Sequence, residues 1–190
     1  MSTRRLFIAI NLNKDIVRCL EEKVSNIMCE APPGIRFLRP ELWHITVFFL
    51  GYQDDGDLPL ITEVIDEAAK NFFSPEIVLD KIIYDSLHRP RMIWAVTDQK
   101  TSESLGLIRE DLEQKLIDGG LSLKNNGKKF QGHITLARFS RGNFGQKLGE
   151  INLKSRDIDA YFPETIDLME SQLSPRGAKY SVLGRSKFRE

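Results

Sequence analysis

Histidine and cysteine are scarce in this chain, and long apolar runs are missing. The 190 residues include three histidines and two cysteines. Cys19 and Cys29 lack the Cys-x-x-Cys spacing of zinc or redox sites, so we expect both to be reduced structural residues. No stretch approaches the ~20 apolar residues that cross a bilayer. The apolar run near the N-terminus is shorter than a secretory signal, so we expect a cytoplasmic protein without a membrane partner, and a monomer by default.

Net charge and several catalytic motifs are also absent. Lys and Arg total 27, as do Asp and Glu, so the charge balance neither favours nor excludes a nucleic-acid partner. The sequence lacks the GxxxxGK[S/T] loop of ATP-hydrolysing proteins, the GxSxG turn of serine hydrolases and the HExxH zinc motif. These absences make ATP hydrolysis, a serine triad and a zinc protease poor explanations of the chain.

Apolar periodicity gives the order of the elements. It predicts helices over 14–30, 58–72 and 102–118, and extended segments within 6–12, 42–50, 75–87, 91–98, 132–139, 165–174 and 178–188. Short turns rather than helical crossovers join several of these strands, which favours an α+β fold with antiparallel sheets. No linker divides the chain, so we expect one domain over residues 1–190.

Two of the three histidines open the same phrase, HIT, at His44 and at His133. On a strand, side chains alternate, so His44 and Thr46 share one face, and His133 and Thr135 do the same. Two polar residues on one face of a half-buried strand need partners or solvent. The repeat therefore predicts two similar lobes, each supplying one strand, around a central cleft that receives all four side chains.

Two imidazoles and two hydroxyls suit a phosphodiester. Because histidine titrates at about pH 6.5, one ring can accept a proton from water while the other donates one to the leaving oxygen. The threonines can hydrogen-bond the non-bridging oxygens or hold the rings. A zinc site needs three or four ligands, and neither phrase has a further Cys, His or carboxylate, so we expect no metal and no cofactor. By strict alternation Phe48 shares the face of His44, where it can stack on a terminal base or pack in the cleft wall.

The phrases and their surroundings resemble the two-histidine (2H) phosphoesterase superfamily, and within it the RNA 2′,3′-cyclic phosphodiesterases, also called 2′-5′ RNA ligase-like proteins. The segments that carry the resemblance are RLFIAI (5–10), FLRPELWHITVFFLG (37–51), PRMIWA (90–95), HITLARF (133–139) and SQLSPRGAKYSVL (171–183). The resemblance implies a bilobal α+β fold with pseudo-twofold symmetry. It also implies hydrolysis of a terminal 2′,3′-cyclic phosphate to a 2′-phosphomonoester, with RNA 3′ ends or cyclic nucleotides as substrates.

The resemblance also implies roles for particular residues. His44 would be the general acid and His133 the general base, with Thr46 and Thr135 on the phosphate. Arg138 matches an arginine of the family's second phrase, which implies a phosphate contact. Strict alternation points Arg138 away from His133, so either the strand is irregular before it or Arg138 is an ion-pair partner.

The sequence departs from the family pattern at two places, and three alternative functions remain open. The family often has proline where this chain has Gly132, and we expect His88, which lacks the phrase, to be a loop residue. The same histidines would serve an ATP-independent 2′-5′ RNA ligase or a 2′-5′ phosphodiesterase. A non-catalytic module that binds RNA ends is the non-enzyme alternative.

Overall fold

A strongly curved antiparallel sheet organises the chain. The computed structural model describes residues 2–31, 34–86, 90–123, 129–139, 151–152, 158–175 and 177–189. Within these residues nine strands pair in the order β7-β4-β5-β6-β3-β1-β8-β9, and β2 adds to β6. The strands are β1 (Thr3–Asn11), β2 (Ile35–Phe37), β3 (His44–Asp54), β4 (Leu79–Tyr84), β5 (Met92–Thr97), β6 (His133–Phe139), β7 (Ile151–Asn152), β8 (Thr165–Ser174) and β9 (Gly177–Lys187).

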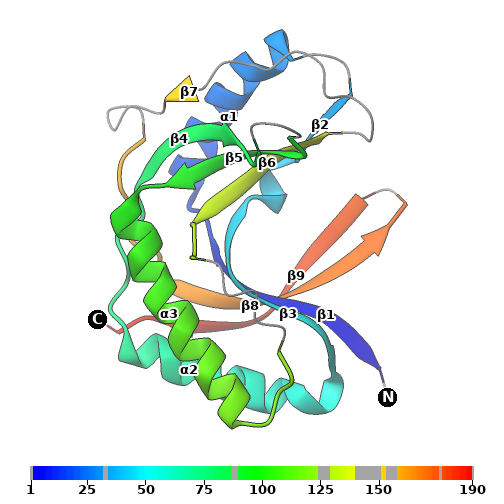
Figure 1. The fold of residues 1–190 in the computed structure, drawn as a ribbon, viewed down its shortest axis with the longest axis vertical. Helices are drawn as coiled ribbons and strands as arrows, with labels where there is room; N and C mark the ends of the chain where they lie inside the picture. The colour runs from blue at the N-terminus through cyan, green and yellow to red at the C-terminus, as the bar shows by residue number, and fades with distance from the viewer. Residues whose placement is uncertain are drawn as a thin grey trace.

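The sheet curls so that its two ends face one another across an open side (Figure 1). β4, β5 and β6 form one arm, and β3, β1, β8 and β9 form the other. The arms adjoin where β3 and β6 pair through Ile45 and Ile134. The β8–β9 hairpin extends beyond the body of the second arm (Figure 1). The antiparallel strands of the two arms thus belong to one continuous sheet.

Three helices cover the outer face of the sheet and complete the core. They are α1 (Lys14–Glu30), α2 (Leu58–Asn71) and α3 (Gln99–Asp118). The Asn13 side chain caps α1 by accepting a hydrogen bond from the Ile16 amide at 2.9 Å. The helices bury residues at helical spacing, such as Leu20 in α1 and Leu105 in α3, against strand residues such as Ile8 and Ile45. In the described part of the chain, none of these three helices covers the opposite, inner face of the sheet (Figure 1).

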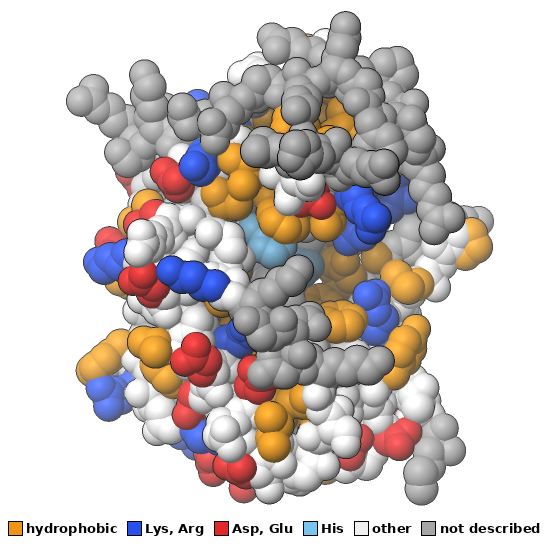
Figure 2. Space-filling model, in the orientation of Figure 1, with side chains coloured by type: hydrophobic (Ala, Val, Ile, Leu, Met, Phe, Trp, Pro, Cys, Tyr) orange, Lys and Arg blue, Asp and Glu red, His pale blue; other side chains and the backbone are white. Residues whose placement is uncertain are grey.

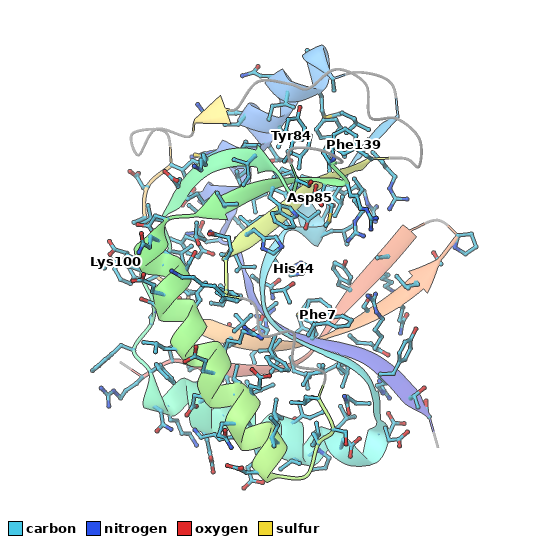
Figure 3. All side chains as sticks on the ribbon, viewed as in Figure 1. Phe7, His44, Tyr84, Asp85, Lys100 and Phe139 are labelled. Atoms are coloured by element: carbon cyan, nitrogen blue, oxygen red, sulfur yellow. The ribbon has the colours of Figure 1, made fainter. Side chains whose placement is uncertain are left out.

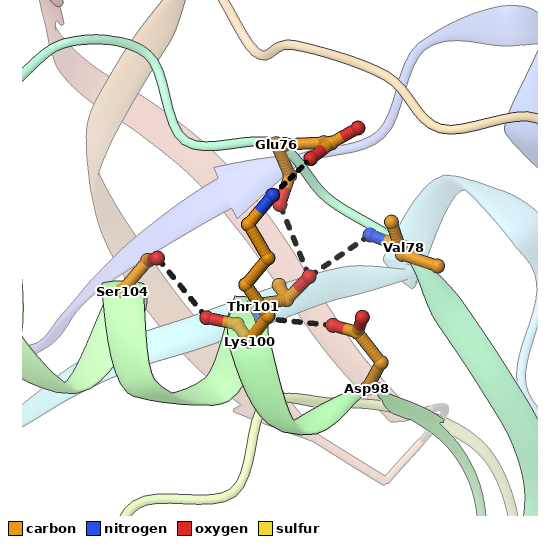
Figure 4. A network of polar contacts seen from close by, with 6 residues as sticks. All are labelled: Glu76, Val78, Asp98, Lys100, Thr101 and Ser104. Carbon is orange, nitrogen blue, oxygen red and sulfur yellow. Dashed lines mark hydrogen bonds and ion pairs between the residues drawn. The ribbon is translucent and has the colours of Figure 1, made fainter.

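The start of α3 is fixed to the segment that leads into β4 (Figure 4). Asp98 caps the helix by accepting from the Thr101 amide at 2.8 Å. The buried Thr101 hydroxyl donates to the Glu76 carbonyl at 3.0 Å and accepts from the Val78 amide at 3.1 Å. On the surface, Lys100 and Glu76 add an ion pair at 2.8 Å, which contributes little to stability because it is exposed. These contacts fix the first turn of α3, which supports the second histidine.

The prediction of an α+β fold with antiparallel pairing is confirmed. The three predicted helices are present, and the segment 165–174 forms a strand with the predicted bounds. Sequence reasoning missed β2 and β7, which have three and two residues and are too short to show a period. Among the described residues, no helix is long and apolar enough to cross a membrane. Cys19 and Cys29 are free thiols.

Candidate active site

The two histidine phrases lie side by side on the inner face of the sheet. His44 begins β3 and His133 begins β6, and the cross-strand partners Ile45 and Ile134 follow them directly. In an antiparallel pair this register sets His44 opposite Thr135, and Thr46 opposite His133. Ile45 and Ile134 are fully buried, whereas the four polar side chains are half-buried and line one groove. The fold thus gathers two imidazoles and two hydroxyls at the junction of its arms.

Each imidazole is held in one tautomer by the carbonyl two residues before it. Nδ1 of His44 donates to the Leu42 carbonyl at 2.8 Å, and Nδ1 of His133 donates to the Gln131 carbonyl at 2.9 Å. A carbonyl oxygen only accepts, so each neutral ring carries its proton on Nδ1 and leaves Nε2 free to accept. Nε2 of His44 lies 3.1 Å from the Thr46 hydroxyl. The two rings therefore present equivalent nitrogens for proton transfer.

Aromatic side chains restrict the orientation of both rings. Trp94 of β5 stacks on His133 with ring centroids 4.1 Å apart and planes inclined by 30°. On the other arm, Phe7 lies 4.9 Å from His44, and Tyr180 meets the edge of that ring at 5.2 Å. Figure 3 shows Phe7 and His44 together on the inner side of the sheet. The rings are thus fixed by packing as well as by hydrogen bonds.

Burial disfavours the imidazolium form at each site. Desolvation lowers the pKa of His44 below its usual 6.5, and the positive charges of His133 and Arg138 lower it further, while the hydrogen bond to Leu42 opposes them. Desolvation also lowers the pKa of His133, opposed by the hydrogen bond to Gln131 and the charge of Asp85. Without a ligand, both histidines are therefore mostly uncharged at pH 7. A bound anion would restore a proton to one of them, because it stabilises the charged form.

A buried network fixes the backbone in front of His133. The Ser102 hydroxyl, in the first turn of α3, accepts from the Gly132 amide at 3.2 Å and from the Gln131 side chain at 3.0 Å. The hydroxyls of Thr97 and Ser102 are hydrogen-bonded to each other at 2.8 Å, and the Thr97 amide donates to the Gly132 carbonyl at 2.9 Å. A Cβ on Gly132 would lie 2.5 Å from the Thr97 hydroxyl, so only glycine fits there without a shift of Thr97. This packing explains the departure from proline at position 132.

Both histidine strands contain a bulge at the same place after the phrase. Ala9 pairs with Thr46 and Ile8 with Phe48, so Val47 is the extra residue in β3. In β6, Trp94 pairs with Thr135 and Ile93 with Ala137, which makes Leu136 the extra residue. Two consecutive residues are then buried in each strand, Val47 with Phe48 and Leu136 with Ala137. The bulges reverse the alternation beyond each phrase.

The bulges decide the positions of Arg138 and Phe48. Arg138 is exposed and lines the groove, on the same face as His133. The expectation that Phe48 shares the face of His44 is wrong, because Phe48 is only 5% exposed and packs in the core behind the sheet. Phe49 takes its place: it is 52% exposed, lines the groove, and packs under the guanidinium of Arg5 at 4.9 Å. Strict alternation could not reveal a bulge, so it chose the wrong phenylalanine.

The groove between the arms has a volume of about 530 Å³. Figure 2 shows histidine atoms in a hollow of this face, with hydrophobic side chains and Lys or Arg atoms around it. Arg5, Arg36 and Arg138 line the groove, and its described lining includes no carboxylate. Sequence reasoning did not select Arg5, Phe7, Arg36 or Tyr180, although three of them lie in segments that carry the family resemblance. His88 lies outside the described residues, and among those described no group of three or more His, Cys, Asp or Glu is placed to hold a metal.

Comparison with known proteins finds a matching family model and relatives that match nearly the whole length of the chain. Residues 12–94 match the family model described as LigT like Phosphoesterase. The RNA 2′,3′-cyclic phosphodiesterase of Thermotoga maritima is 25% identical over 187 residues, covering 97% of this chain and 95% of the relative. The protein of the same name from Archaeoglobus fulgidus is 28% identical over 185 residues, covering 94% and 97%.

Solved structures share the fold. The protein TT0787 of Thermus thermophilus superposes with a TM-score of 0.82 at 22% identity, covering 97% of this chain and 98% of the other. Escherichia coli LigT, in a crystal structure with 3′-AMP, gives a TM-score of 0.74 at 20% identity with full coverage of both chains. These structural matches show the same fold, and the family-model match together with the curated relatives confirms the resemblance to LigT-like phosphoesterases.

Proposed function

Because the chain is similar to LigT-like phosphoesterases of the two-histidine superfamily, we propose that it hydrolyses a terminal 2′,3′-cyclic phosphate of RNA to a 2′-phosphomonoester. The observation that carries this proposal is the pairing of His44 and His133 across one groove, each with Nδ1 bonded to a carbonyl, and with Nε2 of His44 next to the Thr46 hydroxyl. The names of the relatives and the 3′-AMP bound to LigT favour a nucleotide ligand.

The proposed reaction is a single displacement with one proton moved on each side of phosphorus. Nε2 of His133 takes a proton from water, and the water oxygen attacks phosphorus. The bond from phosphorus to O3′ breaks, and Nε2–H of His44 gives its proton to the departing O3′. Water thus supplies the hydroxyl on the 2′-phosphate and, in net balance, the proton on O3′. Each of these two roles is typically worth about 10²–10⁴ in rate.

The remaining groups in the groove would serve the negative charge of the phosphate. Thr46 and Thr135 would donate hydrogen bonds to the non-bridging oxygens, which gain charge as the water attacks. The positive charge of Arg138 would hold the phosphate in the groove. The bound anion would also offset the burial that lowers the pKa of His44, so that the acid is protonated when substrate is present. No step needs a metal.

One assay tests this proposal. The protein is incubated in EDTA with an oligonucleotide that ends in a 2′,3′-cyclic phosphate, and the isomer of the phosphomonoester is identified. We expect a 2′-phosphate at an undiminished rate. A 3′-phosphate would contradict the bond that breaks, and loss of turnover in EDTA would contradict the metal-free mechanism. Thr46→Ser should retain most of the rate and Thr46→Val should lose about tenfold or more, because only the serine keeps the hydroxyl.

The same assay separates the alternatives. Joining of the cyclic phosphate to an added 5′-hydroxyl end would indicate 2′-5′ ligation, which the same histidines serve by microscopic reversibility. Binding without turnover would indicate a module that recognises RNA ends. We also propose one domain of two lobes, a monomer and a cytoplasmic location; a single cooperative unfolding transition, sedimentation and cell fractionation test these.

A further inference from the structure

Two arginines face each other across neighbouring strands at one end of the groove. Arg36 of β2 and Arg138 of β6 are cross-strand partners, so their side chains emerge on the same face. Both are exposed and both line the groove. Like charges in directly opposed positions of a sheet repel one another and destabilise it. An anion held between the two guanidinium groups would turn this repulsion into attraction.

The described carboxylate Asp85 accepts from the amide of Met92, the cross-strand partner of Arg138, but it forms no ion pair with either arginine. Neither Arg36 nor Arg138 forms an ion pair with a described carboxylate, and no carboxylate is among the described residues that line the groove. Arg5, the third arginine of the groove, is engaged elsewhere: it donates to the Ser171 hydroxyl at 3.1 Å and stacks over Phe49. Among the described residues the arginine pair therefore has no carboxylate ion-pair partner, which leaves it able to bind an anionic ligand.

The arginine pair lies beyond the second histidine phrase along β6, and the charge of Arg138 still acts on His44. Arg138 lies three residues beyond Thr135 along β6, but the bulge at Leu136 shortens this separation to roughly 7 Å of strand. The corresponding position on the other arm, after the equivalent bulge in β3, is Phe49. The position five residues after each histidine is thus an arginine in β6 and a phenylalanine beneath Arg5 in β3, although the histidines are arranged with near symmetry.

We infer that Arg36, beside Arg138, binds the phosphodiester one nucleotide upstream of the reacting terminal phosphate. This inference rests on the proposed function and names its substrate class: an oligonucleotide end rather than a free cyclic mononucleotide. A terminal nucleotide in RNA carries its next negative charge on its 5′ side, and a cyclic mononucleotide has none there. The difference between these two positions then fixes the direction of the RNA strand, with the terminal base toward Phe49.

Three substrates isolate the upstream charge. They are adenosine 2′,3′-cyclic phosphate, the dinucleotide ApA with a terminal 2′,3′-cyclic phosphate, and the same dinucleotide with a neutral methylphosphonate in place of its internal phosphodiester. We expect kcat/KM for the charged dinucleotide to exceed that for each of the other two by about tenfold or more. Its dependence on salt should be steeper by about 0.7 in the logarithmic slope, the value for one phosphate contact on a single strand.

Two variants assign this preference to the arginine pair. Arg36→Gln should lower kcat/KM for the charged dinucleotide about tenfold and affect the other two substrates much less. Arg39→Gln is the matched control, because Arg39 is an exposed arginine three positions away that does not line the groove. It should leave the preference intact.

The outcomes separate this inference from the proposed function. Equal rates on all three substrates, or an equal loss on all three in Arg36→Gln, would overturn the upstream site while leaving cyclic phosphate hydrolysis in place. Loss of the preference in Arg39→Gln would indicate a general effect of surface charge and would also overturn it. Turnover of none of the three would overturn the proposed function, and the inference with it.

Discussion

Ile45 and Ile134 are cross-strand partners, and in the described part of the chain they are the single pair through which β3 and β6 adjoin. Their side chains are fully buried on the outer face of the sheet. Because a histidine precedes and a threonine follows each of them, this pair sets two identical phrases in antiparallel register on the inner face. A small apolar contact in the core thereby positions the polar groups of the candidate site.

The lowered histidine pKa values predict an acidic optimum. For one neutral base and one protonated acid, kcat/KM is greatest midway between the two pKa values of the free protein. Burial lowers the pKa of His44 and of His133 below 6.5, so this maximum should fall below pH 6.5. The optimum of kcat should be higher, since bound phosphate favours the imidazolium. A kcat/KM maximum above pH 7 would show that desolvation does not dominate these groups.

Phe48 and Phe49 should respond in opposite ways to truncation. Phe48 is buried in the core, so Phe48→Ala should lower the free energy of unfolding by about 3–5 kcal/mol. Phe49 is half exposed in the groove, so Phe49→Ala should change stability by less than about 1 kcal/mol and raise KM. Urea unfolding and steady-state kinetics measure the two effects. The reverse pattern would refute the bulge at Val47.

Substitutions at Gly132 and Thr97 should have coupled effects on the free energy of unfolding. Gly132→Ala places a Cβ 2.5 Å from the Thr97 hydroxyl and 3.1 Å from its methyl group, which should cost about 1–3 kcal/mol of stability. Thr97→Ala removes both atoms, so the double variant should be more stable than the sum of the single losses predicts. Strictly additive losses in urea unfolding would show that Thr97 does not oppose the new methyl group.

A sulfur substitution should identify the acid. When sulfur replaces the bridging 3′ oxygen of the cyclic phosphate, the leaving thiolate needs far less help from a proton than an alkoxide does. The rate of His44→Ala on this substrate should therefore approach that of the unaltered protein, whereas His133→Ala should remain slow. If the rate of His133→Ala recovered instead, His133 would be the acid and His44 the base. If neither variant recovered its rate, neither histidine would donate the proton to O3′.

Periodicity in the sequence predicted the helices and most strands because each buries a regular apolar stripe. Ile16, Leu20, Val24 and Ile27 recur at helical spacing and are all buried in α1. The doubled phrase likewise indicated that two distant segments meet at one groove. Such patterns are visible because each is contained within a short stretch of chain.

The details that pairing between distant strands decides could not be predicted in this way. The bulges at Val47 and Leu136 follow from the registers of β1 and β5 against the histidine strands, and no local pattern marks them. Arg36 enters the groove because the three-residue strand β2 pairs with β6. Phe7 and Tyr180 reach His44 only through the pairing of β1, β8 and β9.

The single-turnover rate of two histidine variants tests the central claim most directly. The claim is that both rings act on one phosphate, one on each side. His44→Ala and His133→Ala, confirmed as folded by their unfolding transitions, should each open a terminal 2′,3′-cyclic phosphate at least about 10² times more slowly than the unaltered protein. An undiminished rate in either folded variant would contradict the paired mechanism.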